Sequence, residues 1–366
     1  MQRTILLTSL FAFGLAPHLH AQQLMATIDS MMVRYAKPNG PGASLLVIHD
    51  GHVIVAKGYG LADVEQKIPV DKESNFRLAS LSKQFTATAI MLLAADGKLH
   101  YEDDITSVVA GLPAYARGVT IRHLLNHTGG LSGYESFVPD SQTTQVHDAD
   151  VPALISHASA PKFSPGTKYD YSNTGYALLA LAVEHSSGKR YADFLHDRIF
   201  APLGMTGTLA FENGRSVVPH RAYGYRVDTA GNVRRTDQSN TSATLGDGGI
   251  YSNAADLAKW DQAIERHTLV DATSQQRAWT PPVLANGRTS EYGFGWFVDD
   301  DHGTMRVRHH GESRGFTNGI IRYPERRLTV VILTNRSGGA PWDTAQRIAE
   351  LYLGPSAAGG SPAWRP

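Results

Sequence analysis

Strand-like segments at both ends of this chain constrain its fold more than any other sequence feature. Near the start, the apolar runs ASLLVIH and HVIVAKGYG flank Asp50-Gly51, a pair typical of a tight hairpin turn. Near the end, MRVRHH, GIIRYP and LTVVILTN are predicted strands, and Asp343 to Leu353 is a predicted helix. Because a sheet must bury its apolar face against another layer, we predict an α+β sandwich in which one antiparallel sheet is built from both ends of the chain.

The middle of the chain is predicted to be a largely helical insertion. We place the sheet at about 22–75 and 290–353, and the helical region at about 80–290, with a long turn-rich segment at 206–248. Residues 22–355 would then form the folded body, with terminal helices flanking the sheet. The tail, 356–366, has the composition of a flexible segment.

Residues 1–21 have the pattern of a secretory signal peptide. Arg3 precedes an apolar run from Ile5 to Ala16, and a polar stretch then ends at the small residue Ala21. A dozen apolar residues are too few to cross about 30 Å of hydrocarbon. We therefore expect cleavage after Ala21, a periplasmic or secreted location, and no stable membrane insertion of the mature chain.

Composition excludes several functions. The 34 Lys and Arg residues balance the 34 Asp and Glu residues, so no excess positive charge is available to bind nucleic acid. The absence of cysteine excludes disulfides, thiolate nucleophiles and Cys-ligated zinc. We expect no cofactor or metal; a small molecule or peptide is the expected partner, and the oligomeric state stays open.

A serine and a lysine three residues apart form the strongest local motif. Ser80 and Lys83 stand at the start of a predicted helix that ends at Gly97 and would share one face of it. A serine hydroxyl becomes a nucleophile when a neighbour removes its proton, and a buried lysine with a lowered pKa can do so. Alone, the pair is more often a capping serine beside a solvated lysine.

Two further segments raise the case for catalysis. Tyr171 and Asn173 bracket Ser172 just before another predicted helix, where a phenol could relay a proton and an amide could bind a substrate. Alone, they are more often a core tyrosine and a helix cap. His309 and Gly311 follow a predicted strand, and an edge strand with a bare glycine could lie against a substrate backbone.

Together, these motifs resemble the serine β-lactamase and penicillin-binding protein superfamily, specifically its class C-like branch. That branch includes DD-carboxypeptidases, D-aminopeptidases, class C β-lactamases and carboxylesterases. The resemblance extends over nearly the whole mature chain, through TIRHLLNHTGGL (120–131), FLHDRIFAPLGM (194–205), GDGGIYSNAADLAKW (246–260) and YGFGW (292–296). It implies a β-lactamase/DD-peptidase-like fold.

The resemblance also implies roles for the matching residues. Ser80 would be the acylated nucleophile, Lys83 and Tyr171 would relay its proton, and Asn173 would hold the substrate. His309 and Gly311 would line the substrate strand. The backbone N–H groups of Ser80 and Glu312 would form the oxyanion hole.

Two departures from the family pattern concern substrate preference. His309 stands where class C β-lactamases have lysine, so a permanent charge is replaced by one expected only below about pH 6.5. Glu312 stands where a small residue is usual and would repel an anionic substrate if its side chain faced the cleft, although Arg314 could offset it. Tyr-Ser-Asn at 171–173, where β-lactamases have Tyr-Ala-Asn, also leans away from β-lactamase activity.

Two other motifs suggest different chemistry. Gly311 to Gly315 matches Gly-x-Ser-x-Gly, but a nucleophile elbow at Ser313 needs a helix after it, and a strand is predicted there. His123 and His127 have a zinc-like spacing, but no Glu follows His123, so core or capping roles are favoured.

We therefore expect an exported serine hydrolase that forms an acyl-enzyme on Ser80 and cleaves a D-amino-acid peptide or a small acyl ester. A class C-type β-lactamase is the second hypothesis. A slow penicillin-binding sensor without turnover is the alternative from a different functional class.

Overall fold

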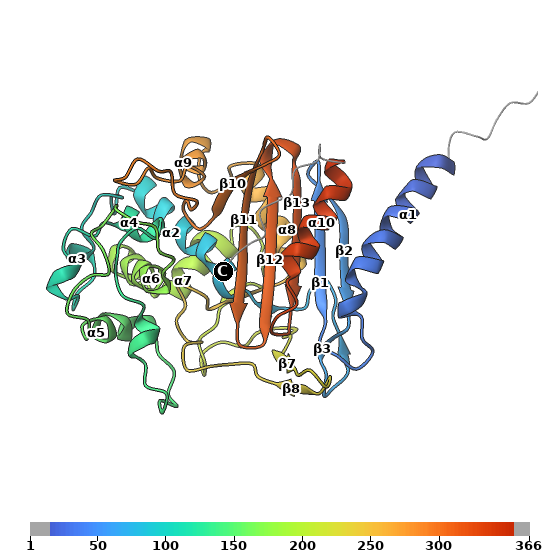
Figure 1. Ribbon diagram of the computed structural model, residues 1–366, viewed down its shortest axis with the longest axis horizontal. Coiled ribbons are helices and arrows are strands. Elements are labelled where there is room, and N and C mark those ends of the chain that lie inside the picture. Colours follow the sequence, from blue (N-terminus) through green and yellow to red (C-terminus); the bar gives the residue numbers. More distant parts are fainter. Residues whose placement is uncertain (1–14, 355–366) are drawn as a thin grey trace, which may run out of the picture.

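The computed structural model describes residues 15–354, so the flexible tail expected at 356–366 and most of the expected signal peptide lie outside the described residues. Its central feature is a six-stranded antiparallel sheet (Figure 1). In spatial order the strands are β10 (Phe297–Asp301), β11 (Thr304–Ser313), β12 (Phe316–Tyr323), β13 (Leu328–Thr334), β1 (Ala43–His49) and β2 (His52–Tyr59). The prediction of one antiparallel sheet made from both ends of the chain is confirmed.

The pairing of β1 with β13 joins the two ends of the chain. Val47 lies opposite Val330 in this ladder, and every residue of β13 is buried. The β1–β2 hairpin turns at Asp50 and Gly51, whose φ angles of 51° and 77° are the left-handed values that the Asp-Gly pair accommodates. The predicted hairpin is therefore confirmed.

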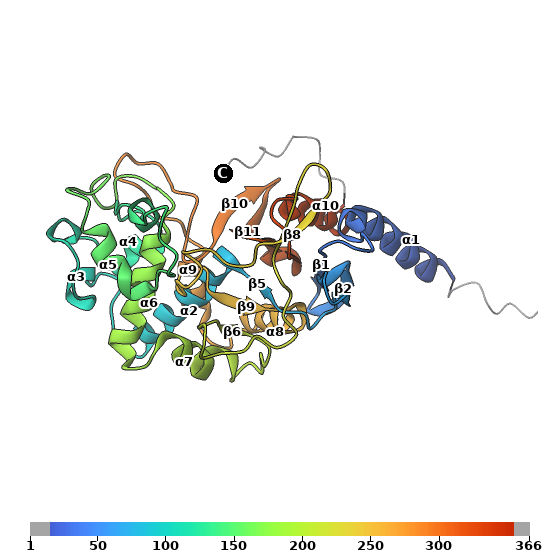
Figure 2. The same ribbon diagram turned by 90° about the horizontal axis from the view of Figure 1, so that it is seen from below.

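Helices cover both faces of the sheet, so every residue of its central strands β12 and β13 is buried. On one face, α1 (Leu15–Met32) and α10 (Pro341–Leu353) pack over β12, β13 and β1. On the other face, α8 (Ala254–Glu265) contacts β1, β2 and β13, and it lies beside β1 and β2 in the view from below (Figure 2). One helix of the predicted helical region thus belongs to the sheet layer.

The remaining helices form a region beside the β10 edge of the sheet (Figure 1). Its centre is the contact between α2 (Lys83–Ala95) and α6 (Asn173–Ser187). Helix α2 is buried on all sides from Lys83 to Leu93, as expected of a helix in the middle of a core. Around the pair lie α3 (Ile105–Val108), α4 (Ile121–Leu125), α5 (Val151–Ile155), α7 (Tyr191–Leu195) and α9 (Ala272–Ala278).

Short elements connect the two layers. A three-stranded sheet joins β5 (Phe76–Arg77), β9 (Ile250–Ser252) and β6 (Leu209–Ala210), and β3 (Leu61–Asp63) pairs with β4 (Ile68–Pro69). The hairpin of β7 (Tyr225–Val227) and β8 (Val233–Arg235) lies within the predicted turn-rich segment. Single turns are η1 (Val33–Tyr35), η2 (Ala79–Ser82), η3 (Ala114–Ala116), η4 (Tyr134–Phe137), η5 (Asp148–Asp150), the π-turn η6 (His196–Phe200) and η7 (Pro324–Arg326).

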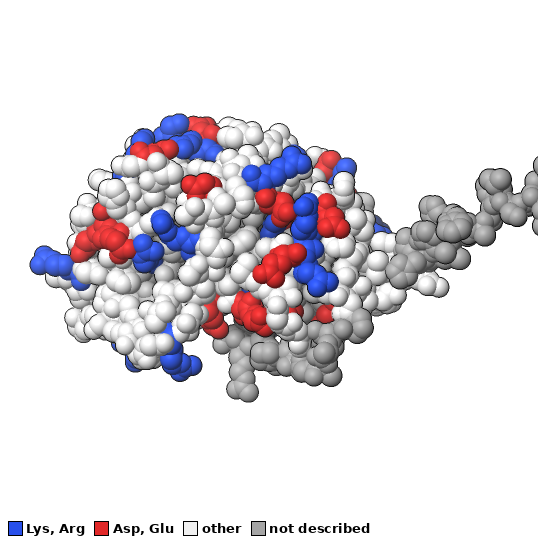
Figure 3. All heavy atoms as spheres, turned by 90° about the horizontal axis from the view of Figure 1, so that it is seen from above, with Lys and Arg blue, Asp and Glu red and all other residues white. Residues whose placement is uncertain are grey.

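The surface carries mixed charge. On the face seen in Figure 3, acidic and basic side chains are interspersed, in agreement with the zero net charge of the chain. None of the helices among residues 15–354 is long and apolar enough to cross a membrane.

Candidate active site

Ser80 is the one residue that reaches solvent in an otherwise buried stretch. From Ser74 to Leu93 every other residue is buried, whereas Ser80 is partly exposed. It lies on η2, between β5 and α2, and the preceding Ala79 has a φ of 51°. Left-handed backbone at a residue with a side chain is uncommon and occurs often at functional sites. The fold therefore presents this hydroxyl from a rigid, strained turn.

Lys83 lies one turn further along and is fully buried. Its Nζ donates hydrogen bonds to Ser80 Oγ at 3.0 Å, to Asn173 Oδ1 at 2.8 Å and to the backbone oxygen of Asp247 at 2.8 Å. Burial lowers the pKa of Lys83 to about 8, against the opposing charges of Asp247 and Glu135. A sizeable fraction of this lysine is therefore neutral near pH 8 and able to accept a proton from Ser80.

Tyr171 lies on the other side of Ser80. The ammonium of Lys83 sits over its ring, 4.9 Å from the ring centre. Its buried hydroxyl lies beside the Ser80 side chain but forms no hydrogen bond within residues 15–354. Burial raises the pKa of Tyr171 well above 10, and the neighbouring Ser80 hydroxyl opposes that rise. The phenol therefore stays protonated.

Asn173 is the first residue of α6, and its amide is held at both ends. The oxygen accepts from Lys83, and Nδ2 donates to Glu135 Oε1 at 2.8 Å. The cap of the helix is Ser172, whose hydroxyl accepts from the N–H of Gly175 at 3.4 Å. The alternative of Asn173 as a helix cap is thus excluded. Exposed Glu135, on η4, was not singled out from the sequence.

Gly311 lets β11 approach the turn that carries Ser80. A Cβ atom at this position would lie 2.2 Å from the backbone oxygen of Leu78, so no other residue fits. β10 pairs with β11 only up to Arg308, so from His309 onward this side of β11 is an edge, as predicted. From His309 onward, β12 remains its strand partner and η2 packs against it. This close approach places the backbone of Glu312 next to the turn of Ser80.

His309 is buried and does not present its ring to solvent. Its Nε2 lies 2.8 Å from the Tyr292 hydroxyl, and Nδ1 lies 2.6 Å from the backbone oxygen of His310. Burial lowers the pKa of His309 well below 6.5. The expectation of a positive charge below about pH 6.5 is therefore corrected, because desolvation keeps this imidazole neutral at that pH.

Two carboxylates behind Lys83 were also missed from the sequence. Asp148 accepts from the backbone N–H groups of Leu245 at 2.8 Å and Gly246 at 3.3 Å, and the next residue, Asp247, supplies the backbone oxygen that Lys83 contacts. Burial raises the pKa of both carboxyl groups. Nothing in the local sequence at Asp148 indicates this role, since its partners lie almost a hundred residues away.

The two histidines of the zinc-like pair, His123 and His127, have different structural roles. His123 accepts a hydrogen bond from the N–H of Thr120 at 3.1 Å and caps α4, which ends before His127. His127 Nδ1 accepts from the N–H of Ser172 at 3.2 Å, and its ring lies 4.3 Å from that of Tyr171. His127 therefore supports the site, and residues 15–354 contain no cluster suited to hold a metal ion.

The Beta-lactamase family model matches residues 21–353 of this chain. The chain belongs to the Beta-lactamase family. It is a serine hydrolase of the β-lactamase and penicillin-binding protein superfamily, and the resemblance inferred from the sequence is confirmed.

Curated relatives of this family member include penicillin-binding protein 4* of Bacillus subtilis, which is 36% identical over 316 residues, covering 82% of this chain and 70% of the relative. A D-aminopeptidase of Gluconobacter oxydans is 26% identical over 336 residues, covering 89% of this chain and 61% of that protein. The chain thus spans about three fifths of that second relative's length.

Solved structures of related proteins share the fold. A penicillin-binding protein homologue from Pyrococcus abyssi matches with a TM-score of 0.75 and 28% identity, over 91% of this chain and 77% of the other. D-amino acid amidase from Ochrobactrum anthropi matches with a TM-score of 0.77 and 25% identity, over 91% of this chain and 100% of the amidase.

The α/β-hydrolase alternative at Ser313 does not fit the fold of this Beta-lactamase family member. After Ser313 the chain turns directly into β12, without the helix that a nucleophile elbow requires.

Proposed function

We propose that this protein cleaves an ester or amide through an acyl-enzyme on Ser80, with a D-amino-acid peptide or a small acyl ester as substrate. The observation that carries the proposal is the contact between Ser80, the one solvent-reaching side chain of its stretch, and the buried Lys83 with its pKa of about 8. A general base is most effective when its pKa lies near the working pH.

In the proposed reaction, neutral Lys83 takes the proton of Ser80 as Oγ attacks the substrate carbonyl. The backbone N–H groups of Ser80 and Glu312 stabilise the oxyanion. Tyr171, kept protonated by burial, donates its proton to the leaving group and regains one from Lys83. The products of this step are acylated Ser80, a protonated leaving group and neutral Lys83, and water then releases the acyl group by the reverse proton route.

Glu135 supports a substrate with a free amino group. Its exposed carboxylate hydrogen-bonds the amide of Asn173, beside Lys83, where it would complement the α-ammonium of an amino-acid amide or peptide. The D-aminopeptidase and D-amino acid amidase relatives support the D configuration.

A penicillin-binding function is the second candidate, favoured by the relative penicillin-binding protein 4*. Efficient β-lactamase activity ranks behind it, because the neutral, buried His309 offers no charge to a substrate carboxylate.

The test combines turnover with covalent trapping. We expect the mature protein to hydrolyse D-alanine p-nitroanilide or p-nitrophenyl acetate, and Ser80→Ala to lose about 10³-fold or more of kcat/KM. Intact mass after brief exposure to benzylpenicillin should show an adduct only in the wild type if penicillin binds. Equal turnover of substrate by wild type and Ser80→Ala would overturn the proposal. A stable penicilloyl adduct without turnover of either substrate would instead support a slow penicillin-binding sensor.

A further inference from the structure

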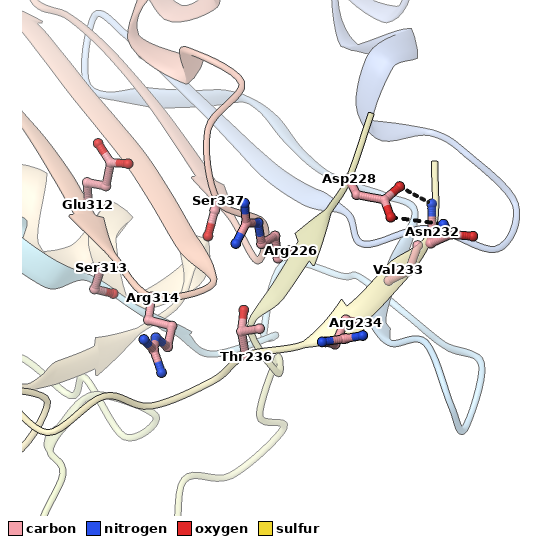
Figure 4. Close-up of a pocket in the computed structure, with 10 residues that line it drawn as sticks. All are labelled: Arg226, Asp228, Asn232, Val233, Arg234, Thr236, Glu312, Ser313, Arg314 and Ser337. Carbon is pink, nitrogen blue, oxygen red and sulfur yellow. Dashed lines mark hydrogen bonds between the residues drawn. The ribbon is translucent and has the colours of Figure 1, made fainter. Parts of the chain in front are cut away.

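An open groove of about 880 Å³ lies beside the end of β11 (Figure 4). Glu312, Ser313 and Arg314 form one side of this groove, and the β7–β8 hairpin forms the other. The hairpin is fixed to the sheet by the N–H of Tyr225, which donates to the backbone oxygen of Asn335 at 3.0 Å. The complete lining is Arg226, Asp228, Asn232, Val233, Arg234, Thr236, Glu312, Ser313, Arg314 and Ser337.

Three arginines of the groove have no carboxylate partner. Among residues 15–354, no ion pair or hydrogen bond is formed by the side chains of Arg226, Arg234 or Arg314. Asp228 also lines the groove but forms no ion pair with them among the described residues; its carboxylate accepts from the N–H of Asn232 at 2.8 Å and from its side-chain amide at 2.9 Å. The groove therefore offers three free guanidinium groups, which suit carboxylates better than any other side chain does.

Two hydroxyl groups, one on each side of the groove, point to the same ligand chemistry. Ser313 Oγ and Thr236 Oγ1 are buried and have no hydrogen-bond partner within the described residues. Unsatisfied buried hydroxyls are uncommon and require a reason. Both can donate a hydrogen bond to an anion that enters between the strand and the hairpin.

The groove adjoins the proposed oxyanion hole. In the proposed reaction Glu312 contributes its backbone N–H to that hole. Its side chain lines the groove, and strand alternation places it on the face of β11 opposite Gly311. An extended chain advances about 3.3 Å per residue. A substrate bound at Ser80 and extended along the end of β11 would reach Arg314 about two residues from the scissile bond.

We propose that this groove is a specificity subsite for a carboxylate that a peptide substrate carries about two residues from its scissile bond. The inference rests on the proposed hydrolysis at Ser80. In this subsite, three guanidinium groups farther from the nucleophile would provide the positive charge that class C β-lactamases have as lysine at the position of His309.

The test uses matched peptides that differ only by Glu against Gln, placed on the acyl side or on the leaving-group side of the scissile bond. We expect kcat/KM to favour the Glu peptide of one pair by about tenfold at low salt, which corresponds to three exposed ion pairs of ordinary strength. The preference should shrink in 0.5 M NaCl. It should vanish in the triple variant Arg226→Gln, Arg234→Gln, Arg314→Gln, and rise in Glu312→Gln.

Arg326→Gln is the matched control, since exposed Arg326 lies on η7 at the opposite end of β12. Its Glu preference should equal that of the wild type. No preference in either peptide pair, or a preference that survives in the triple variant, would overturn the inference.

A direct binding measurement separates this inference from the proposed function. Calorimetric titration of Ser80→Ala with tetraglutamate should show binding that the triple variant loses, and tetraglutamine should not bind. If no peptide is hydrolysed but tetraglutamate binds in this way, the proposed hydrolysis at Ser80 is contradicted and carboxylate binding in the groove is supported. If tetraglutamate does not bind, the groove inference fails.

Discussion

At the scale of single residues, the charge of Lys83 is the property on which the site depends. Burial disfavours its ammonium form, whereas the nearby carboxylates of Asp247 and Glu135 favour it, and the balance puts its pKa at about 8. Proton transfer from Ser80 needs neutral Lys83, so activity should rise as pH rises through this value.

We expect kcat/KM for a neutral ester such as p-nitrophenyl acetate to have an ascending limb centred at about pH 8. Glu135→Gln removes a negative charge that raises the pKa of Lys83, so the limb should move to lower pH by about half a unit to one unit. Initial rates read at a wavelength independent of pH test both points. A limb that stays in place in Glu135→Gln would contradict the assignment of Lys83 as the base.

Residue identities at the site could be predicted from the sequence, but their charge states could not. Ser80, Lys83, Tyr171 and Asn173 follow from the resemblance of their motifs to the β-lactamase superfamily, and the structure brings them together. The low pKa of His309 and the high pKa of Tyr171 arise from burial by side chains distant in sequence, which no local pattern records.

At the scale of elements, η5 positions the loop that Lys83 contacts. Asp148 accepts two backbone N–H groups of this loop, and the following residue turns its backbone oxygen to Lys83 Nζ. The two oxygens of a carboxylate can accept both hydrogen bonds, whereas the side-chain amide of asparagine would place its NH₂ group against one of the two N–H donors. Asp148 is thus a positioning residue.

Asp148→Asn should lower kcat about tenfold with a smaller change in KM, and should destabilise the fold by about 1–3 kcal/mol because it leaves a buried donor unpaired. It should also shift the ascending limb of the pH profile, a change that purely structural damage would not produce. Asp150→Asn is the control, since the carboxylate of this exposed neighbour on η5 accepts only from the N–H of His147 among the described residues. Matching pH profiles for the two variants would contradict the positioning role.

Elements with local signals were predicted well, and those set by long-range contacts were not. The Asp50-Gly51 hairpin follows from its turn residues and strand pattern. How far the free edge of β11 extends depends on where its pairing with β10 stops, and α4 ends before His127, where the chain takes a φ of 58°.

At the scale of the whole molecule, the site lies where the helical region meets the sheet. The helical side contributes Ser80, Lys83 and Asn173, and the sheet contributes β11. The sheet itself needs both ends of the chain, because β1 pairs with β13. The α+β class could be predicted from this arrangement of strands, whereas the packing of α8 on the sheet could not, since its sequence does not show which layer it covers.

Export is the last expectation, and the fold is compatible with it. Among the side chains of α1 that the structure describes, Ile28 and Met32 are fully buried and lie after the proposed cleavage point at Ala21, so cleavage there would keep both in the core. Expression of the complete chain in a Gram-negative bacterium should therefore yield a periplasmic protein whose first residue is Gln22, as read by intact mass and N-terminal sequencing. Ala21→Arg should block processing, because the position before the cut requires a small residue. Recovery of the uncleaved chain from the cytoplasm alone would contradict the proposed signal peptide.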